Sequence, residues 1–319
     1  IWLILQHPDG FTGEILVCDN TQDIGTGIND LDNNSDDPNQ SIPDVISTFQ
    51  AKGYPVYCLD WNYIWDKVVT EYSEGNYDDG YVYDPGPKIS YPKFRSPSGS
   101  YYVSLRHGLW NPAASAYDLS RLCLVDFPVL KAHSIAGATV AVKNWVGVMT
   151  TAYGDKRYGG LRWHDAILFD GYVAKTMAAT FPKLSIVDAT WTTTKGPRDL
   201  SSIQRTNMIA ASTDPCAVSW FAAKYILTPL AGASANPDAR GETYNILLEK
   251  WTTVLRDAGF PCTNKASEIC VYGKQGLMRW ILLQATLVTK KAWIIKKSWV
   301  KLEATMGEPD LPLFARYLI

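Results

Sequence analysis

The amino-acid sequence predicts an α/β fold with a mainly parallel central sheet flanked by helices, and with irregular, loop-rich insertions. Several short apolar runs are bounded by turn-forming residues, which is typical of buried strands. Amphipathic segments of helical period follow several of these runs, and this alternation favours parallel strand pairing. With 319 residues, of which 46% are hydrophobic, the chain is long enough to bury a sizeable core.

The first expected unit is a strand, a helix and a second strand. Residues 14–18 and 55–59 have the apolar character of the two strands. The helix between them is expected over residues 42–51, and Ser41 and Pro43 are typical of a helix start. This succession indicates that the two strands are parallel.

The next segments mix irregular and regular patterns. Residues 72–102 are rich in Tyr, Gly, Pro, Ser and Asp without a sustained period, and we expect loops and short hairpins there that could act as a lid. The apolar run 122–130 predicts a buried strand. Residues 136–149, with many small side chains, and residues 163–181, with apolar side chains at helical spacing, predict two helices.

Two strands and two helices are expected after these. The compact apolar runs 184–188 and 207–211 predict the strands. Asp214 and Pro215 predict the N-cap and first turn of one helix. Residues 239–258 have the period of another amphipathic helix.

Residues 1–272 are expected to form a single α/β domain, followed by a basic tail over residues 273–319. The tail contains eight Lys and Arg residues against three Asp and Glu residues, and its paired lysines stand among tryptophans. This pattern fits a solvated helix with one buried stripe, a helix that docks on another subunit, or a segment on a membrane surface. We expect one of the first two, and subunit docking would make the protein a homo-oligomer.

Composition argues against several partners and cofactors. The formal net charge is −2, so a nucleic-acid partner is not expected. No apolar run approaches the ~18 residues of a membrane-spanning helix, so no transmembrane segment is expected. The six cysteines lack the spacing of iron–sulfur ligands, and no iron–sulfur cluster is expected. A disulfide between Cys262 and Cys270 is left open.

Basic, imidazole and amide side chains gather just after the apolar run 122–130. Polar groups at the carboxyl end of a strand are where open α/β sheets place ligands. Lys131 and Lys143 are expected to bind a small anionic molecule, because each supplies a positive charge and three donors. Asn144 is expected to add an orienting hydrogen bond.

Two histidines and one carboxylate are the candidate catalytic residues. His133 or His164 would transfer a proton, because imidazole titrates near neutral pH. Asp188 would orient a histidine, or the three side chains would hold a divalent metal with open positions for a substrate. The alternative is that each histidine bonds a backbone carbonyl and is structural.

An acidic stretch early in the chain is a candidate calcium site. Carboxylate and amide oxygens alternate in it, at Asp30, Asp32, Asn34 and Asp36. The glycine and the terminal glutamate of an EF-hand loop are absent from this stretch. The alternative is a solvated loop that binds no ion.

The segment from about 101 to 227 resembles the family known as domain of unknown function 362. Six ordered motifs carry the resemblance: Pro-Val-Leu-Lys-Ala-His ending at His133, residues 137–144, His164, Ile-Val-Asp ending at Asp188, Gly196-Pro197, and Ala-Ser-Thr-Asp-Pro at 211–215. Residues 17–22 also look similar to the family. The resemblance implies an α/β fold, and because many members are exported it implies export.

This chain departs from the family pattern in two respects. Some members carry an added iron–sulfur segment, and its cysteines are missing here. Ser219 stands where the family commonly has an acidic residue, which puts any role of that position in doubt. The resemblance therefore implies fold and site position, and it implies no particular reaction.

Two functional hypotheses follow from these observations. In the first, the protein binds or transforms a small anionic ligand at the C-terminal rim of the sheet, with metal assistance as an option. In the second, it is a non-catalytic exported protein that self-assembles through its tail and its aromatic surface. The sequence names neither the substrate nor the reaction.

Overall fold

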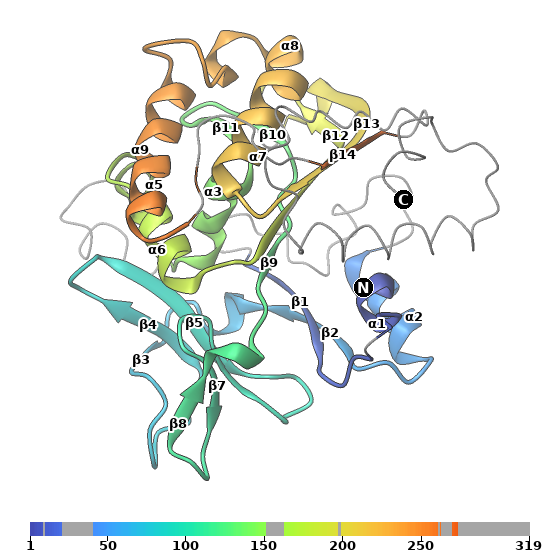
Figure 1. Ribbon diagram of the computed structural model, residues 1–319, viewed down its shortest axis with the longest axis vertical. Coiled ribbons are helices and arrows are strands. Elements are labelled where there is room, and N and C mark those ends of the chain that lie inside the picture. Colours follow the sequence, from blue (N-terminus) through green and yellow to red (C-terminus); the bar gives the residue numbers. More distant parts are fainter. Residues whose placement is uncertain are drawn as a thin grey trace.

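Helices and strands are both present in the computed structural model, so the expected α/β class is confirmed (Figure 1). The structure describes residues 1–8, 10–20, 41–150, 163–196, 199–260, 262 and 270–273. The prediction of a mainly parallel central sheet is not confirmed. Within the described residues the strands form separate sheets with mixed parallel and antiparallel pairing.

The first strand–helix–strand unit has the predicted parallel arrangement. Strand β1 (Ile15–Asp19) pairs in parallel with β2 (Val56–Asp60), and α2 (Ile42–Gln50) packs against β2. The helix begins at Ser41, whose hydroxyl group accepts a hydrogen bond from the backbone N–H of Asp44 in a capping box. Because the strands run in the same direction, Asp19 and Asp60 lie side by side at their carboxyl ends.

The four-stranded sheet explains why the predicted parallel order is absent. Its strands lie in the order β14 (Cys270–Gly273), β13 (Ile203–Ser212), β12 (Leu184–Thr193), β9 (Val125–Asp126). Only the β12–β9 pair is parallel. The connection between β12 and β13 is residues 194–202, shorter than the roughly twelve residues of a parallel crossover, so these strands form an antiparallel hairpin.

The segment 72–102 contributes to a regular sheet rather than to a lid. Its predicted hairpins are present, but they belong to a six-stranded sheet in which the first pair is parallel and the others are antiparallel. Strand β5 is buried on both faces along most of its length, which removes the polar–apolar alternation that would have revealed it. The strands are β3 (Val68–Val69), β4 (Gly80–Asp84), β5 (Ile89–Arg95), β6 (Tyr102–Ser104), β7 (Gly108–Asn111) and β8 (Ala116–Asp118).

The helix predicted over residues 136–149 is only partly correct. Residues 137–139 form β11 (Gly137–Thr139), which pairs in antiparallel fashion with β10 (Lys131–His133). A short α3 (Ala141–Asn144) and the 3-10 turn η4 (Trp145–Val148) follow. Gly137 has a φ of 77°, and an added Cβ atom would overlap the backbone carbonyl of Ser234 and the side chain of Tyr244. Close packing against a distant segment therefore decides this conformation.

The helices predicted over residues 163–181 and after Asp214 are present in the structure. The predicted helix over 163–181 is divided at Gly171, whose φ is 75°. Asp214 is the predicted N-cap, and its side chain accepts hydrogen bonds from two backbone N–H groups of the first turn. The longer elements are α5 (Trp163–Phe169), α6 (Tyr172–Thr180), α7 (Pro215–Phe221) with its π-helical continuation η6 (Ala222–Leu227), α8 (Thr228–Ala231) and α9 (Thr243–Asp257). The shorter ones are α1 (Trp2–Leu5), η2 (Trp61–Ile64), η3 (Leu119–Arg121), η5 (Leu200–Ser202) and η7 (Ala233–Ala235).

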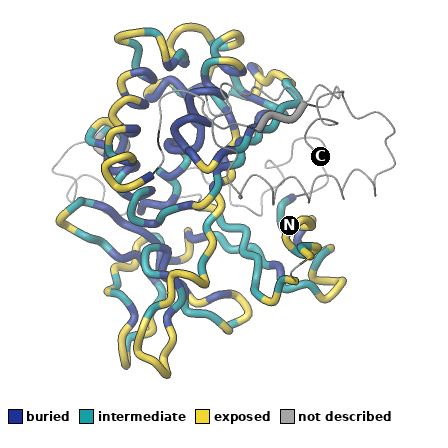
Figure 2. Tube along the Cα trace, viewed as in Figure 1, coloured by how far each residue is buried: buried dark blue, intermediate teal, exposed yellow. Residues whose placement is uncertain are grey.

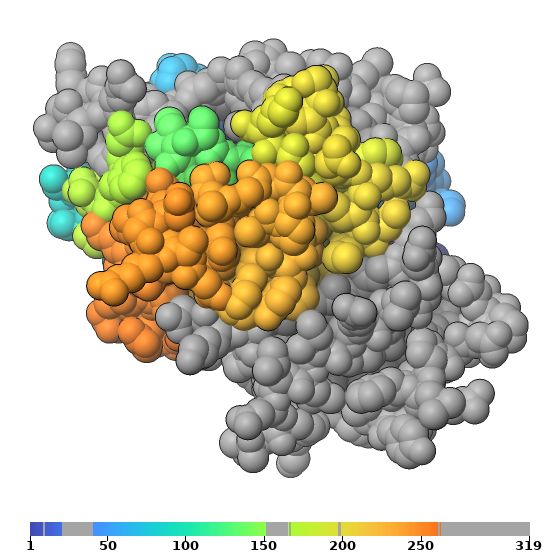
Figure 3. Space-filling model, turned by 90° about the horizontal axis from the view of Figure 1, so that it is seen from above, coloured from blue at the N-terminus to red at the C-terminus, as the bar shows by residue number. Residues whose placement is uncertain are grey.

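One contiguous hydrophobic core joins these parts. It extends from Tyr81 and Phe94 in the six-stranded sheet, through Val142 in α3, to Trp251 in α9. Figure 2 shows the most deeply buried stretches inside the group of helices. In Figure 3, α8 and α9 in orange lie beside the yellow β12–β13 hairpin on one outer face. Within the described ranges no helix has both the length and the apolar character needed to cross a membrane.

Candidate functional site

The two lysines predicted to bind an anion lie close together in the structure. Lys131 is half-buried at the start of β10, and Lys143 is buried in α3 with a relative exposure of 7%. Burial, and after it the positive charge of Lys131, lowers the pKa of Lys143 to about 7. Two ammonium groups from different elements are therefore near enough for their charges to repel each other.

A carboxylate from the parallel strand pair interacts with Lys131. Burial lowers the pKa of Lys131, and the negative charge of Asp19 at the end of β1 partly offsets this shift. Asp19 is exposed, Lys131 is half-buried and Lys143 is buried, so solvent exposure decreases from Asp19 to Lys143. The sequence analysis did not assign Asp19 to the site. The available signal was its position as the last residue of the first predicted strand.

Asn144 contacts a buried carboxylate that the sequence analysis also missed. The Asn144 side-chain amide donates a hydrogen bond of 2.8 Å to Asp126, and the Ser185 hydroxyl group donates one of 3.1 Å to the other carboxylate oxygen. Asp126 is 1% exposed. Burial raises its pKa to about 7, although both hydrogen bonds act in the opposite direction. Asn144 thus holds α3 to β9 and β12, and one of its amide hydrogens is committed to this contact.

His133 is held by its own turn. Its Nδ1 atom accepts hydrogen bonds of 3.1 Å from the backbone N–H groups of Ile135 and Ala136, between β10 and β11. These two contacts fix the orientation of the imidazole ring, and they engage Nδ1 as an acceptor. This is close to the structural alternative stated above, with backbone N–H groups in place of the expected carbonyl groups.

Asp188 is also engaged locally. One of its carboxylate oxygens accepts hydrogen bonds of 2.8 and 2.7 Å from the backbone N–H and the hydroxyl group of Thr190. Its backbone pairs with residues 128–130, so Asp188 lies on the strand next to the segment that leads into Lys131. His164 lies in α5, but its side chain is outside the described part of the structure, as are Asp30, Asp32, Asn34, Asp36 and the tail beyond residue 273.

A different group of metal-ligating side chains does converge in the described part of the chain. The ligand atoms of Asp214, Cys216 and Cys262 lie within 4.8 Å of one another, and all three residues are buried. Asp214 is already engaged as the cap of α7. Cys262 is a free cysteine in contact with Cys216, so the disulfide left open between Cys262 and Cys270 is not formed. A hydrogen bond with Cys216, followed by burial, raises the pKa of the Cys262 thiol.

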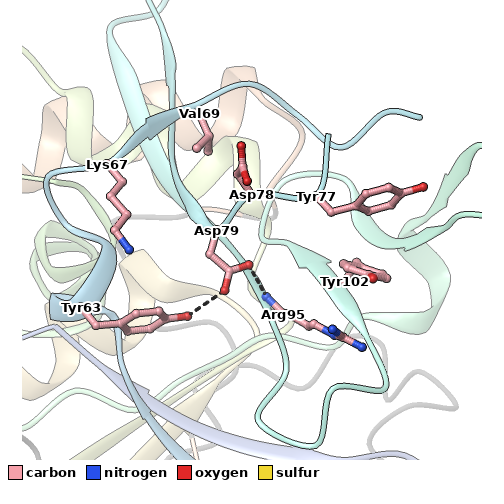
Figure 4. Close-up of a pocket in the computed structure, with 8 residues that line it drawn as sticks. All are labelled: Tyr63, Lys67, Val69, Tyr77, Asp78, Asp79, Arg95 and Tyr102. Atoms are coloured by element: carbon pink, nitrogen blue, oxygen red, sulfur yellow. Dashed lines mark hydrogen bonds between the residues drawn. The ribbon is translucent and has the colours of Figure 1, made fainter. Parts of the chain in front are cut away.

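An open groove of about 490 Å³ lies on the six-stranded sheet (Figure 4). Asp79 points into it and accepts hydrogen bonds from the backbone N–H of Arg95 at 2.8 Å and from the Tyr63 hydroxyl group at 3.4 Å. The rings of Tyr77 and Tyr102 are 5.2 Å apart, and the Arg95 guanidinium group lies 5.3 Å from the Tyr102 ring. Two carboxylates and two cations line the groove, so it suits a polar ligand better than an ion of one sign.

Comparison with known proteins relates one segment of the chain to a family. Residues 101–224 match the model of a domain of unknown function (DUF362). No curated protein and no solved structure matches the chain. The matched segment contains Lys131, Lys143, Asn144 and Asp126, whereas Asp19 lies outside it. The lysine site therefore combines residues of the family segment with a strand that precedes it.

Proposed function

We propose that the protein binds or transforms a small anionic molecule at Lys131 and Lys143, which lie in the segment 101–224 that matches the DUF362 family model. The observation that supports the proposal is the electrostatic interaction of the buried Lys143 with the half-buried Lys131. Within the described residues, the side-chain ammonium group of Lys143 has no hydrogen bond or ion pair.

The energetics of this pair favour an anionic ligand. Burying a charge without a partner costs free energy, and a second like charge adds to that cost. An anion that contacts both ammonium groups removes the repulsion and supplies the missing hydrogen bonds. Asp19 offsets only part of the shift at Lys131, so it leaves the positive potential around Lys143 available to a ligand.

Metal assistance is a secondary part of the proposal. A divalent ion would be held by the side chains of His133, His164 and Asp188. Supporting this are the Thr190 contacts of Asp188, which engage only one of its two carboxylate oxygens, and the orientation of His133 through its Nδ1 atom. Metal analysis of the purified protein tests it: metal retained by wild type and lost in His164→Ala supports the ligand set, and equal metal content in both overturns it.

Anion binding is tested by calorimetry with inorganic phosphate and oxalate as probes. We expect Lys143→Met to weaken binding at least tenfold, because it removes a buried positive charge. Lys183→Met is the matched control, since Lys183 is exposed and lies on a different surface segment. We also expect wild-type affinity to increase as the pH falls through about 7, where Lys143 gains its proton. Unchanged affinity in Lys143→Met would overturn the proposal.

A second candidate function, self-assembly, is favoured by one surface feature. Val125, Phe127 and Val129 are 43%, 58% and 46% exposed along the edge of the four-stranded sheet. Exposed apolar residues in a row are typical of interfaces. We propose the basic tail of a second copy as the occupant, because the tail follows β14 at the opposite edge of the same sheet. Light scattering on the full chain and on a variant ending at residue 273 tests this, and an oligomer that survives truncation contradicts it.

A further inference from the structure

The groove on the six-stranded sheet has a lining that the proposed function does not use. Neither Lys131 nor Lys143 is among the residues that line it, and only Tyr102 of its lining lies in the segment that matches the family. Its volume of about 490 Å³ falls within the roughly 300–1,000 Å³ of small-molecule sites. The groove is therefore a candidate binding site of its own, built mainly from residues that precede the family segment.

Tyrosine rings are exposed at two places along the groove. Tyr63 is 46% exposed and Tyr77 is 38% exposed. In Figure 4 these two rings lie on either side of Asp79, and Tyr102 lies beside Tyr77 with its ring centre 5.2 Å away. A tyrosine ring has an apolar face and a polar hydroxyl group at its end. The groove therefore presents flat apolar surface at two separate points.

Hydrogen-bonding groups of both kinds lie among these rings. The Asp79 carboxylate accepts the backbone N–H of Arg95 at 2.8 Å and the Tyr63 hydroxyl group at 3.4 Å. A carboxylate has about four acceptor positions, so these two contacts leave acceptor capacity for a ligand. The Lys67 ammonium group lies 6.0 Å from the Tyr63 ring centre, and it supplies donors, as does the Arg95 guanidinium group. A ligand in the groove therefore meets acceptors and donors together.

Paired strands hold these groups in place. Arg95 and Tyr102 are cross-strand partners in the β5–β6 pair, which brings the guanidinium group to 5.3 Å from the ring centre. Gly80, the residue after Asp79, lets β4 approach β3 closely. A Cβ atom at Gly80 would come within 2.8 Å of the backbone carbonyl oxygen of Lys67. The geometry of the groove is therefore set by the sheet, as a binding site requires.

We propose that this groove binds a neutral saccharide of at least two sugar rings. The C–H face of a pyranose ring packs against an aromatic ring, and its hydroxyl groups both donate and accept hydrogen bonds. The carboxylates of the groove repel an anion and its cations repel a cation, whereas an uncharged saccharide uses both kinds of group. Tyr63 and Tyr77 fit two sugar rings, and Asp79 fits a hydroxyl group between them.

Saturation-transfer difference NMR on the full chain tests the proposal. The probes are cellobiose, maltose, lactose and N,N′-diacetylchitobiose, each at about 10 mM, a concentration at which a weak site is still occupied. We expect transfer to at least one of these disaccharides. The transfer should be strongest at the C–H protons of one ring face, because that face packs against a tyrosine. Leucine and choline, measured in the same way, represent a zwitterion and a cation.

Variants locate the binding in the groove. Tyr63→Ala and Tyr77→Ala should each weaken it at least about tenfold, because each removes one stacking surface, whereas Tyr77→Phe should keep it. Asp79→Asn should weaken it as well, because it removes one acceptor oxygen. Tyr225→Ala is the matched control, since Tyr225 is 46% exposed like Tyr63 but lies in η6. Titration of the NMR signal gives each affinity, and circular dichroism checks that each variant is folded.

Three results would overturn the proposal. The first is no transfer to any of the four disaccharides. The second is equal affinity in wild type, Tyr63→Ala and Tyr77→Ala, which would place the saccharide outside the groove. The third is transfer to leucine or choline without transfer to a disaccharide, which would assign the groove to a charged ligand. Lys143→Met should leave saccharide binding unchanged, so failure of the anion site and failure of the saccharide site are distinguishable.

Discussion

At the scale of single residues, two buried ionisable side chains have pKa values moved to about 7 from opposite directions. Burial raises the pKa of Asp126 and lowers that of Lys143, because both side chains lose solvation of their charged forms. Each shift makes the free energy of unfolding depend on pH near neutrality. The sign differs between the two residues, which allows their effects to be separated.

Lys143→Met should stabilise the protein more at pH 6 than at pH 9. Between about pH 7 and 10.5 the unfolded lysine holds a proton that the folded protein has released, so the wild-type free energy of unfolding rises with pH. The advantage of Lys143→Met should therefore shrink by about 2–3 kcal/mol between pH 6 and pH 9. Urea unfolding at both pH values measures this. Lys52→Met, at an exposed site, should show no such dependence.

Asp126→Asn should have the opposite pH dependence. Between about pH 4 and 7 the folded protein holds a proton on Asp126 that the unfolded chain has released, so wild-type stability falls as the pH rises. Because asparagine resembles the neutral acid, the variant should gain about 2–3 kcal/mol relative to wild type between pH 5 and pH 8.

The alanine variant at the same position separates charge from hydrogen bonding. Asp126→Ala leaves the Asn144 amide and the Ser185 hydroxyl group without their acceptor, and we expect a loss of about 1–3 kcal/mol at pH 5. Urea unfolding of the two variants and wild type gives the comparison. Equal stability of Asp126→Asn and Asp126→Ala would show that the hydrogen bonds contribute nothing.

At the scale of elements, the hairpin of β10 and β11 determines where Lys131 and His133 lie. Its conformation depends on Gly137, which pairs with His133 across the hairpin and lies against Ser234 and Tyr244. A helix was predicted over residues 136–149 because many of the side chains there are small. These side chains serve close packing, which either a helix or a tightly packed strand can use.

Gly137→Ala should destabilise the protein by about 2–4 kcal/mol, because the added Cβ atom meets backbone and the φ angle is positive. Gly147→Ala is the matched control. Gly147 lies in η4, a Cβ atom there would contact nothing within 4 Å, and its φ is not positive. Denaturant midpoints of both variants measure the contrast, and equal midpoints would contradict the role given to Gly137.

At the scale of the whole molecule, the sheets and helices share one hydrophobic core, so their stabilities are linked. Among the described cysteines, Cys123 is exposed, whereas Cys216 and Cys262 are buried. Cys216 lies in the first turn of α7, and Cys262 lies in the segment that follows α9. The raised pKa of Cys262 further reduces its reactivity, because the thiolate is the reactive form.

Iodoacetamide at pH 8 should therefore modify Cys123 in the native protein, while Cys216 and Cys262 stay protected. In increasing urea, both buried thiols should become reactive in the main unfolding transition measured by tryptophan fluorescence. Peptide mass spectrometry reports each cysteine separately. Modification of Cys262 well before that transition would show that the segment after α9 opens independently of the core.

Several elements could be predicted correctly from short stretches of sequence, because their signals are local. The strand–helix–strand unit at 15–60, the Ser41 cap and the Asp214 cap each depend on a few neighbouring residues, and all three are present. Lys131 and Lys143 are only twelve positions apart in the chain, and their shared role in binding an anion stays a prediction. Burial of an apolar face and satisfaction of a helix end act over one or two turns of chain.

Contacts between distant segments could not be predicted from the sequence and became known from the three-dimensional structure. Nothing near Asp126 in the chain indicates Ser185 as its partner, and nothing near Asp19 indicates Lys131. The antiparallel direction of β12 and β13, and the six-stranded sheet around β5, were likewise missed. The physical reason is that pairing between remote strands and charges is selected by how the whole core packs, and many pairings satisfy the same local pattern.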